Sequence, residues 1–411
     1  MYKKYAIITA NKKHLKAIKK VKEKTKIKVV FFVMHASVWK YDGLYKIFEA
    51  EERFTPLVVI FPYMGSEKTI VRNQIDDAYN FFLKKKYNVL KTYNEKNDKW
   101  LDIKKEVNPD IIFFSMPYRT KIEYDIINYL NCLTCYVPYG YMITHRPYLL
   151  YQQLLHNLVF RFYVESEFHL EQVKKYTKTK GSNAVVVGYP GIDDLLFPKE
   201  IENKTALWKK KDMKLKRIIW APHYTIFDNG TNFCYSNFLE YYQIMFEIAK
   251  KYEDSIQIAF KPHPVLKSEL YKNPDWGKKR TDKYCKQWAE LENGQLNESD
   301  YIELFLSSDA MIFDSGSFIA EYLCVNKPSL YQVRNKNIPE GFGELGKKAI
   351  ACHYQAFAKE DLFNFIEDVV LGGNDSLRQK RENFVQNYLM PPNNKKACEN
   401  IYSDICKTIG I

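Results

Sequence analysis

Residues 256–264 read IQIAFKPHP and residues 309–328 read DAMIFDSGSFIAEYLCVNKP, and these two stretches decide the fold. In each of them, an apolar run typical of a buried strand ends in a short polar cluster. The second cluster leads directly into a helix-like segment that Pro328 closes. A strand, a polar turn and a helix in this order predict an α/β unit. The turn leaves backbone N–H groups free at a helix start, where the helix dipole favours an anion.

The two polar clusters indicate a ligand. The first is Lys261-Pro262-His263-Pro264 and the second is Asp314-Ser315-Gly316-Ser317. Ligands of open α/β sheets collect outside the carboxyl ends of the strands. Two such ends carrying His, Lys and Ser therefore predict one crevice that holds one phosphorylated ligand.

The size and composition of the chain predict two packed domains and an anionic partner. The chain has 411 residues, more than a single hydrophobic core usually serves, and 46% of them are hydrophobic. Lys and Arg number 62 against 49 Asp and Glu, which gives a formal net charge of +13. Such a charge fits a nucleotide, a nucleic acid, a phosphopolymer or an acidic membrane surface, and does not choose among them.

The cysteines and the hydropathy pattern predict a cytoplasmic protein. Eight cysteines are scattered through apolar runs, and the pair Cys132 and Cys135 lacks the further ligands of a zinc site. We expect no signal peptide and no membrane-spanning run. A short strand is expected at 5–10, YAIITA, followed by a lysine-rich helix at 11–26. Two interpretations of that helix stay open: a surface helix, or a helix that rests on the anionic inner face of the cell membrane.

Apolar runs and amphipathic segments alternate along the chain. Val-, Ile- and Phe-rich strands that alternate with helices are typical of a parallel sheet covered on both faces. The pattern stops in a lysine-rich stretch at 197–216 and resumes with RIIWAPH at 217–223. We therefore predict an α/β protein of GT-B architecture, with two Rossmann-like doubly wound domains facing a central crevice. The expected parts are residues 1–205, residues 206–390 and a terminal helix at 391–411 that packs back on the first domain.

Two histidines are candidates for binding a diphosphate. His223 and His263 each follow a strand, and Lys261 lies near the second of them. Together they offer positive charge, and a cationic histidine is expected to stabilise charge that develops on a phosphoryl group. The chain has no DxD pair to hold a divalent ion on a diphosphate. We therefore predict a reaction that needs no metal and no cofactor.

A serine pair and a glutamate complete the candidate site. Ser315 and Ser317 flank Gly316, which lets a phosphate approach the backbone; the alternative is that the serines are ordinary helix N-caps. Glu321, one turn further along, is expected to reach a ribose hydroxyl or to remain a solvated helix carboxylate. Residues 341–346 fit GxGxxG, but we expect neither a strand before them nor a helix after them, and interpret them as a loop.

Five motifs taken together resemble the CDP-glycerol glycerophosphotransferase family of teichoic-acid and capsule enzymes. The resemblance covers most of the chain and implies a GT-B fold and a peripheral-membrane enzyme. Such an enzyme moves a polyol phosphate from a CDP-polyol donor to a hydroxyl of a growing polymer or lipid-linked primer. The acceptor is expected on the first domain and the nucleotide donor on the second. The motifs are SVWKYDGLY at 37–45, GYPGIDDLL at 188–196, WAPH at 220–223, KPHP at 261–264 and FDSGSFIAEYLCVNKPSLY at 313–331.

The resemblance also implies roles for individual residues. Ser315, Ser317 and His263 would hold the diphosphate, and Glu321 would hold the cytidine ribose. The last motif also contains Asp314 and Gly316, which we count among the substrate-binding residues.

The chain departs from that family's pattern in two places. Typical members carry a His-Gly pair in the first domain, thought to supply the base, where this chain has Tyr139-Gly140. Members commonly have Pro-Arg-Asn-Asp where this chain has Pro190-Gly191-Ile192-Asp193, which removes one cation. These departures indicate a capsule or lipooligosaccharide branch, with Tyr139 in the catalytic position and Gly140 beside it.

The implied mechanism is in-line attack of an acceptor hydroxyl on the β-phosphorus of CDP-glycerol or a related CDP-polyol, with CMP leaving. The acceptor is a glycan or a lipid-linked molecule. The nearest alternative is a GT-B glycosyltransferase that uses a CMP-sugar such as sialic acid or Kdo, and a nucleotide-sugar epimerase is another. A basic RNA-binding or polymer-binding protein is disfavoured because RRM, KH and zinc-finger signatures are lacking, so we expect no nucleic-acid partner.

Overall fold

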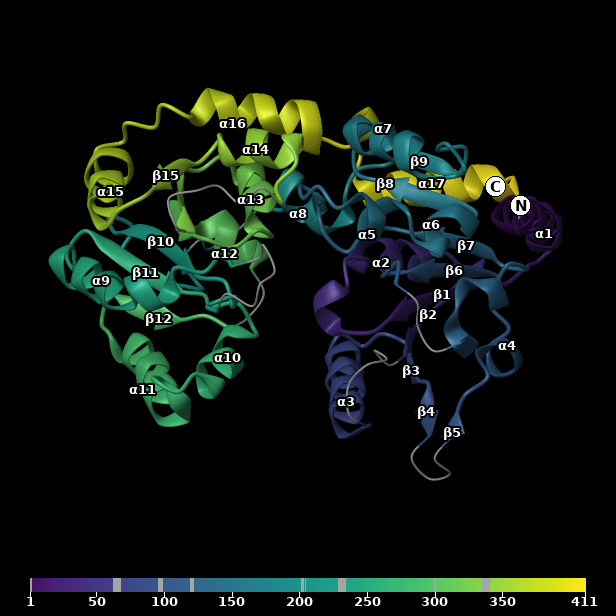
Figure 1. Ribbon diagram of the computed structural model, residues 1–411, viewed down its shortest axis with the longest axis horizontal. Coiled ribbons are helices and arrows are strands. Elements are labelled where there is room, and N and C mark those ends of the chain that lie inside the picture. Colours follow the sequence, from purple (N-terminus) through teal and green to yellow (C-terminus); the bar gives the residue numbers. More distant parts are fainter. Residues whose placement is uncertain are drawn as a thin grey trace. The chain divides into compact units, whose positions relative to one another are not determined.

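The protein divides into two compact α/β units (Figure 1). Unit 1 comprises Met1–Met142, Arg146–Asp193 and Tyr388–Ile411, and unit 2 comprises Ile143–His145 and Asp194–Asn387. The computed structural model describes residues 2–61, 68–94, 99–118, 122–200, 203, 205–227, 234–298, 301–334 and 341–411.

Unit 1 is built on a seven-stranded parallel sheet with the strand order β3-β2-β1-β6-β7-β8-β9. The order runs outward from β1 on one side and then on the other, as in doubly wound sheets. A separate two-stranded ribbon, β4 and β5, follows β3. The strands are β1 (Ile27–Val33), β2 (Phe54–Ile60), β3 (Val89–Lys91), β4 (Tyr93–Asn94), β5 (Lys99–Trp100), β6 (Ile111–Phe114), β7 (Leu133–Tyr136), β8 (Arg161–Val164) and β9 (Ala184–Val186).

Both faces of this sheet are buried, which explains its continuous apolar strands. Alternate residues of β1 belong to different cores: Phe31 packs in one hydrophobic cluster and Phe32 in the other. The helices that supply the two outer layers are α1 (Tyr2–Lys22), α2 (Asp42–Ala50), α3 (Lys68–Lys84), α4 (Ile103–Glu106), α5 (Pro147–Tyr151), α6 (Leu154–Leu158), α7 (Glu167–Tyr176) and α17 (Ala397–Ile409).

The last helix, α17, returns to unit 1 and packs against α2 and α1, beside which it lies in Figure 1. Asp193 holds the start of this helix, because its carboxylate accepts from the Ala397 N–H at 2.7 Å and from the Cys398 N–H at 3.0 Å. Further along, Asp404 accepts from Arg161 Nε and from the Tyr163 hydroxyl, each at 2.8 Å. Buried and partly buried polar contacts thus join segments more than two hundred residues apart in the chain.

Unit 2 is built on a six-stranded parallel sheet with the order β12-β11-β10-β13-β14-β15. The strands are β10 (Lys216–Ala221), β11 (Ile256–Phe260), β12 (Gly294–Leu296), β13 (Ala310–Phe313), β14 (Ser329–Gln332) and β15 (Tyr354–Ala356). The helices are α8 (Asp193–Leu196), α9 (Phe238–Lys251), α10 (Leu266–Lys272), α11 (Gly277–Glu290), α12 (Ile302–Ser307), α13 (Phe318–Glu321), α14 (Glu344–Ile350), α15 (Lys359–Asn364) and α16 (Arg378–Phe384). A 3-10 turn, Tyr322–Val325, extends α13, and π-helical segments, Phe365–Leu371 and Val385–Leu389, follow α15 and α16.

These two parallel, doubly wound sheets confirm the predicted α/β fold class. The prediction of a strand at 5–10 is wrong, because α1 begins at Tyr2 and continues to Lys22. The buried positions Ala10, His14, Ala17 and Val21 recur at helical spacing, and a six-residue apolar run does not by itself distinguish strand from helix.

The expectation that no helix follows the GxGxxG segment is also wrong, since α14 begins at Glu344 inside it. Gly346 lies in this helix, where a Cβ would come within 2.5 Å of the Ile143 carbonyl oxygen. The glycine therefore serves close packing of α14. Residues 335–340, which precede the segment, lie outside the described residues.

Among the described residues, none of the helices is both long and apolar enough to cross a lipid bilayer.

Because several histidines are buried, we expect the free energy of unfolding to fall in mild acid. Burial lowers the pKa of five histidines to between about 3 and about 4, and an unfolded histidine titrates near 6.5. As the pH falls below 6.5, these histidines bind protons in the unfolded chain but not in the folded one, so the free energy of unfolding falls. The five residues are His14, His156, His223, His263 and His353.

Buried carboxyl groups act in the opposite direction but are fewer. Burial raises the pKa of Asp314 to about 7, that of Asp193 to about 6, and also that of Glu165, so these groups favour folding as the pH falls. Five histidines outweigh three carboxyl groups, since each contributes up to about 1.4 kcal/mol per pH unit. Thermal unfolding of the ligand-free protein should therefore occur at lower temperature at about pH 5 than at about pH 7. A higher midpoint at pH 5 would contradict this balance.

Candidate active site

Three loops of unit 2 meet at the carboxyl edge of its sheet. They follow the adjacent strands β11, β10 and β13, whose registers bring their ends level. The His263 N–H donates to the Pro222 carbonyl at 3.0 Å, and the His223 N–H donates to Asp314 Oδ1 at 2.6 Å. The structure thus brings together the polar clusters that the sequence assigned to one ligand.

The strand order reverses at this same edge. From β10 the chain moves outward to β11 and β12, and then returns to β13 on the other side of β10. The connections from β10 and β13 leave in opposite directions, and ligands of doubly wound sheets bind at such a switch point. The three loops therefore lie where a ligand of this fold is expected.

Hydrogen bonds around the His223 ring determine its tautomer. The residue is 8% exposed, and its Nδ1 lies 2.8 Å from the Thr225 hydroxyl and 3.4 Å from the Thr225 N–H. The Tyr235 N–H donates to that same hydroxyl, which leaves the hydroxyl hydrogen for the ring. Nδ1 is therefore the acceptor, and Nε2 carries the proton and acts as a donor.

His263 has the same tautomer for a different reason. The Val265 N–H donates to His263 Nδ1 at 3.2 Å, so Nε2 is again the donor. The two imidazoles lie edge to face with ring centroids 5.0 Å apart. Tyr224 packs on both, with centroid distances of 4.4 Å to His223 and 4.6 Å to His263. The site therefore holds two imidazole N–H donors under one tyrosine ring.

Burial favours the neutral form of both histidines in this ligand-free site. Burial, with a contribution from His263, lowers the pKa of His223 to about 3. Burial, with a contribution from the Lys261 charge, lowers the pKa of His263 to about 4. The cation of this edge is Lys261, which is 9% exposed. In this ligand-free site, each neutral imidazole has an Nε2–H group to offer as a hydrogen-bond donor.

Asp314, in the loop after β13, binds the loop after β10. It is fully buried, and its two carboxylate oxygens accept from the His223 N–H and the Asn237 N–H, each at 2.6 Å. Burial raises the pKa of this carboxyl group to about 7, while those two amides and the Arg334 charge oppose the rise. The carboxylate therefore fixes the position of the His223 backbone and of the start of α9.

The serine-glycine turn lies between β13 and α13. Ser315 is buried and Ser317 is exposed, with Gly316 between them. A Cβ on Gly316 would make only ordinary contacts, 3.8 Å from Phe342 and 3.9 Å from Tyr235, so packing does not require glycine here. A glycine that the fold does not need is compatible with close approach of a ligand to the backbone.

Glu321 is buried, so it is not the solvated helix carboxylate of the alternative interpretation. It is 4% exposed and lies at the end of α13. His353, which belongs to none of the sequence motifs, anchors this helix: its Nε2 bonds to the Ile319 carbonyl at 2.8 Å and its Nδ1 lies 2.6 Å from the Ser329 hydroxyl.

Residues that no sequence motif predicted fix the loop after β10. Arg334 donates to the carbonyls of Thr225 at 3.1 Å and Ser236 at 2.8 Å. Asn237 donates through Nδ2 to the Gln332 carbonyl at 2.9 Å. These side chains bind backbone carbonyls that lie far away in the sequence, so no local motif predicts their role. The middle of this loop, residues 228–233, lies outside the described residues.

Tyr139 and Gly140 belong to unit 1, at the carboxyl end of β7. The Tyr139 hydroxyl lies 3.4 Å from the Tyr118 hydroxyl, and the Tyr139 carbonyl accepts from the Tyr189 hydroxyl at 3.0 Å. A Cβ on Gly140 would meet only the end of the Met142 side chain, at 3.9 Å. The other predicted site residues all lie in unit 2.

A buried polar cluster fixes the backbone just after Gly140. Glu165 accepts from the Met142 N–H at 3.3 Å, and His169 Nε2 bonds to the Met142 carbonyl at 2.8 Å. The Ser166 hydroxyl lies 2.8 Å from His169 Nδ1. A carbonyl oxygen can only accept, so His169 Nε2 is the donor in the bond to Met142. Glu165 and Ser166 directly follow β8, and His169 lies in the first turn of α7. The cluster holds the turn that carries Tyr139.

Solved structures with the same fold define the class of the protein. The wall teichoic acid polymerase TagF superposes with a TM-score of 0.61 at 12% identity, covering 98% of both chains. UDP-GlcNAc 2-epimerase from Neisseria meningitidis bound to UDP-GlcNAc gives 0.58 at 14% identity, covering 93% of this chain and 100% of that one. The S. aureus MnaA–UDP structure gives 0.58 at 14% identity, covering 93% and 97%. This chain thus has the two-domain GT-B fold of glycosyltransferases and nucleotide-sugar epimerases.

Within this class, a sequence-family comparison identifies the family. The model described as CDP-Glycerol:Poly(glycerophosphate) glycerophosphotransferase matches residues 156–406, more than half of the chain. The chain belongs to this family of transferases, which confirms the resemblance drawn from the motifs. The matched range includes the three loops of unit 2 and begins after Tyr139 and Gly140. A comparison with curated protein sequences found no match.

Asp314→Asn should separate ligand binding from stability, with Asp193→Asn as a matched control. Each aspartate is buried and accepts two backbone N–H groups, and an amide replaces one of those acceptors by a donor. We expect each variant to lose about 1–3 kcal/mol of unfolding free energy. Only Asp314→Asn should also weaken CMP binding, measured by calorimetry, because Asp314 contacts the His223 loop and Asp193 does not. Equal CMP affinity in the two variants would contradict that role.

Proposed function

We propose that the protein transfers glycerol phosphate, or a related polyol phosphate, from its CDP-linked donor to a hydroxyl of a cell-surface glycan or lipid-linked acceptor, with release of CMP. The observation that carries the proposal is the pair of imidazole Nε2–H donors beside Lys261 at the switch point of unit 2. Family membership supplies the reaction type. No finding favours the alternative donor, a CMP-sugar.

The donor diphosphate is assigned to the edge formed by β10, β11 and β13. Lys261 supplies the cation, and His223 and His263 donate hydrogen bonds to phosphoryl oxygens, where charge-assisted bonds are strongest. An anion bound there raises the pKa of both imidazoles above their ligand-free values. No metal is invoked, since these three side chains provide donors and charge.

The rest of the donor is assigned to the turn after β13. Ser315, Gly316 and Ser317 form the phosphate-binding turn, and Glu321 binds a ribose hydroxyl of the cytidine. Asp314 acts as a positioning residue, because both of its carboxylate oxygens accept from backbone amides.

The chemical step is an in-line displacement at the β-phosphorus. The acceptor hydroxyl oxygen forms the new P–O bond while the bond from that phosphorus to the bridging oxygen breaks, and CMP leaves with the bridging oxygen. The acceptor hydroxyl proton is released as the new bond forms. We assign the acceptor to unit 1, with the Tyr139 hydroxyl hydrogen-bonded to the attacking group and the Gly140 backbone beside it. Positioning and charge stabilisation, not covalent catalysis, lower the barrier.

Replacing His263 by glutamine and by asparagine tests this assignment. A glutamine amide nitrogen lies close to the position of Nε2, whereas an asparagine amide nitrogen lies close to that of Nδ1. Because Nε2 is the donor here, we expect His263→Asn to lower turnover of CDP-glycerol by about 100-fold or more and His263→Gln to retain more of it. CMP release measures the rate, and thermal unfolding checks that both variants fold.

Two outcomes would count against it. If both variants kept turnover near that of the wild type, His263 would not contact the donor. If His263→Asn retained more turnover than His263→Gln, the hydrogen-bond donor would be Nδ1 and the assigned tautomer would be wrong.

We further propose that α1 rests on an anionic membrane surface. One face of α1 is buried against unit 1, and the opposite face exposes apolar side chains, of which Tyr5 is 71% and Leu15 62% exposed. Lysines lie along the same exposed face, and each lysine near an acidic bilayer contributes about 1 kcal/mol of attraction. The exposed residues of this face include Tyr5, Ile8, Lys12, Leu15, Lys16 and Lys19.

Charge reversal on α1 tests that proposal. The triple change Lys12→Glu, Lys16→Glu and Lys19→Glu should abolish flotation of the protein with vesicles that contain acidic phospholipid. The matched control reverses three exposed lysines of α11, Lys278, Lys279 and Lys283, and should float like the wild type. Equal loss in the two triple variants would mean that overall charge, and not α1, drives binding. Flotation that is indifferent to acidic lipid would exclude the proposal.

A further inference from the structure

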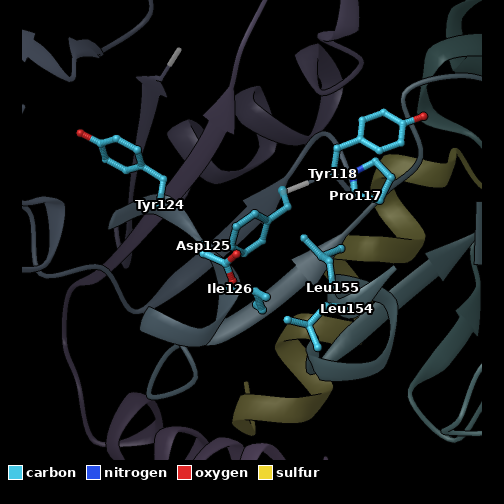
Figure 2. Close-up of a pocket in the computed structure, with 8 residues that line it drawn as sticks. Pro117, Tyr118, Tyr124, Asp125, Ile126, Leu154 and Leu155 are labelled. Carbon is cyan, nitrogen blue, oxygen red and sulfur yellow. The ribbon is translucent and has the colours of Figure 1, made fainter. Parts of the chain in front are cut away.

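Two tyrosine hydroxyls meet at the carboxyl edge of the unit 1 sheet. Tyr118 follows β6 and Tyr139 follows β7, two adjacent parallel strands, and their hydroxyl oxygens lie 3.4 Å apart. Both side chains are only partly buried. Tyr118 lines the small pocket shown in Figure 2, and there its hydroxyl points away from Asp125. Two hydroxyls in one place offer a third hydroxyl group both a donor and an acceptor.

Tyr41 fixes the spacing of the strand ends that lead to these tyrosines. It is 1% exposed, and its hydroxyl donates at 3.0 Å to the carbonyl of Phe114, the last residue of β6. The same hydroxyl lies 3.4 Å from the carbonyl of Val137, directly after β7. Tyr41 belongs to the SVWKYDGLY motif at 37–45, which the proposed chemistry does not otherwise use.

Tyr189 holds the backbone of Tyr139. Its side chain is buried, and its hydroxyl donates to the Tyr139 carbonyl at 3.0 Å. Gly191 leaves the space that the Tyr189 ring occupies: a Cβ on Gly191 would lie 2.5 Å from Tyr189 Cζ and 2.6 Å from its hydroxyl oxygen. Nonbonded carbon atoms pack at about 3.5–4.0 Å, so a side chain at position 191 would displace the buried ring.

The two places where the chain departs from the family pattern are therefore connected in the structure. Tyr139 replaces the histidine of typical members, and Gly191 replaces an arginine. In this chain, the glycine admits the Tyr189 ring, and the Tyr189 hydroxyl binds the Tyr139 carbonyl. A long side chain at position 191 is incompatible with this placement of Tyr189.

We infer that the Tyr118 and Tyr139 hydroxyls together bind the attacking hydroxyl of the acceptor, and that Tyr189, in the space left by Gly191, positions this pair. One tyrosine oxygen accepts from the acceptor O–H while the other tyrosine donates to its oxygen, which fixes the direction of attack. The inference rests on the proposed function and deepens it, because Tyr118 becomes a second contact to the acceptor. Tyr189 and Gly191 are positioning residues.

Tyr118→Phe tests the hydroxyl pair, with Tyr124→Phe as the matched control. Each change removes one hydroxyl and keeps the ring, and in Figure 2 these two hydroxyls point in opposite directions from residues that line the same pocket. The Tyr124 hydroxyl donates to the Leu101 carbonyl at 3.0 Å, a structural contact. Tyr118→Phe should lower kcat/KM for a short poly(glycerol phosphate) primer about three- to tenfold, the equivalent of one hydrogen bond, and Tyr124→Phe should not. The KM for CDP-glycerol and the calorimetric affinity for CMP should stay unchanged in both.

Tyr189→Phe and Gly191→Ala test the positioning role. The first removes the bond to Tyr139 and adds no atom, and the second displaces the Tyr189 ring. Each should lower kcat/KM for the primer about threefold or more with unchanged CMP affinity. Gly191→Ala should have a smaller effect in the Tyr189→Phe background, where that bond is already absent. Gly341→Ala is the matched control, since a Cβ there meets nothing within 4 Å, and it should behave as the wild type.

The outcomes distinguish the two proposals, with thermal unfolding as the check that each variant folds. A wild type that releases no CMP from CDP-glycerol with any primer overturns the proposed function, and this inference with it. A wild type that turns over normally, with primer kcat/KM in Tyr118→Phe equal to that in Tyr124→Phe, overturns the hydroxyl pair alone. Wild-type kcat/KM in Tyr189→Phe overturns the positioning role. Weaker CMP binding in Tyr118→Phe would also overturn the assignment to the acceptor.

Discussion

The buried carboxylate of Asp314 is the constraint on which the rest of unit 2's ligand edge depends. Burying it is costly, and the cost is offset because its two oxygens accept from two backbone amides that would otherwise lack partners. One amide belongs to His223 and the other to Asn237 at the start of α9. The position of the first imidazole, the entry into α9 and the end of β13 are therefore determined by one side chain, which Arg334 supports by holding the same loop.

In unit 1, buried side chains likewise bind backbone groups after the end of β7. There, Glu165 accepts from the Met142 N–H and His169 donates to the Met142 carbonyl, and together they determine the path of the turn that carries Tyr139. In both units, buried polar side chains bind backbone groups beside the candidate ligand-binding residues. A loop fixed in this way loses little entropy when a ligand binds, which preserves binding energy for the transition state.

The sequence predicted what depends on local patterns and missed what depends on burial and distant contacts. The apolar runs that became β10, β11 and β13 and the polar clusters at their ends were readable, and the structure brings those clusters together. Three-residue strands such as β12 and β15 were too short to show a period. The lowered pKa of His263 could not be predicted from the sequence, because it follows from burial. The role of Arg334 could not be predicted either, because this side chain binds carbonyls about a hundred residues away.

The capping of α17 by Asp193 has a consequence for the order in which the chain acquires its structure during synthesis. Unit 1 is interrupted by nearly all of unit 2, and its last helix is translated after unit 2 is complete. A ribosome-bound chain therefore has all of unit 2 available for folding while unit 1 still lacks α17. Until residues 397–409 have been synthesised, the side chains of α1 and α2 that pack against α17 lack this partner, so the first core of the chain is completed only after unit 2 has been made.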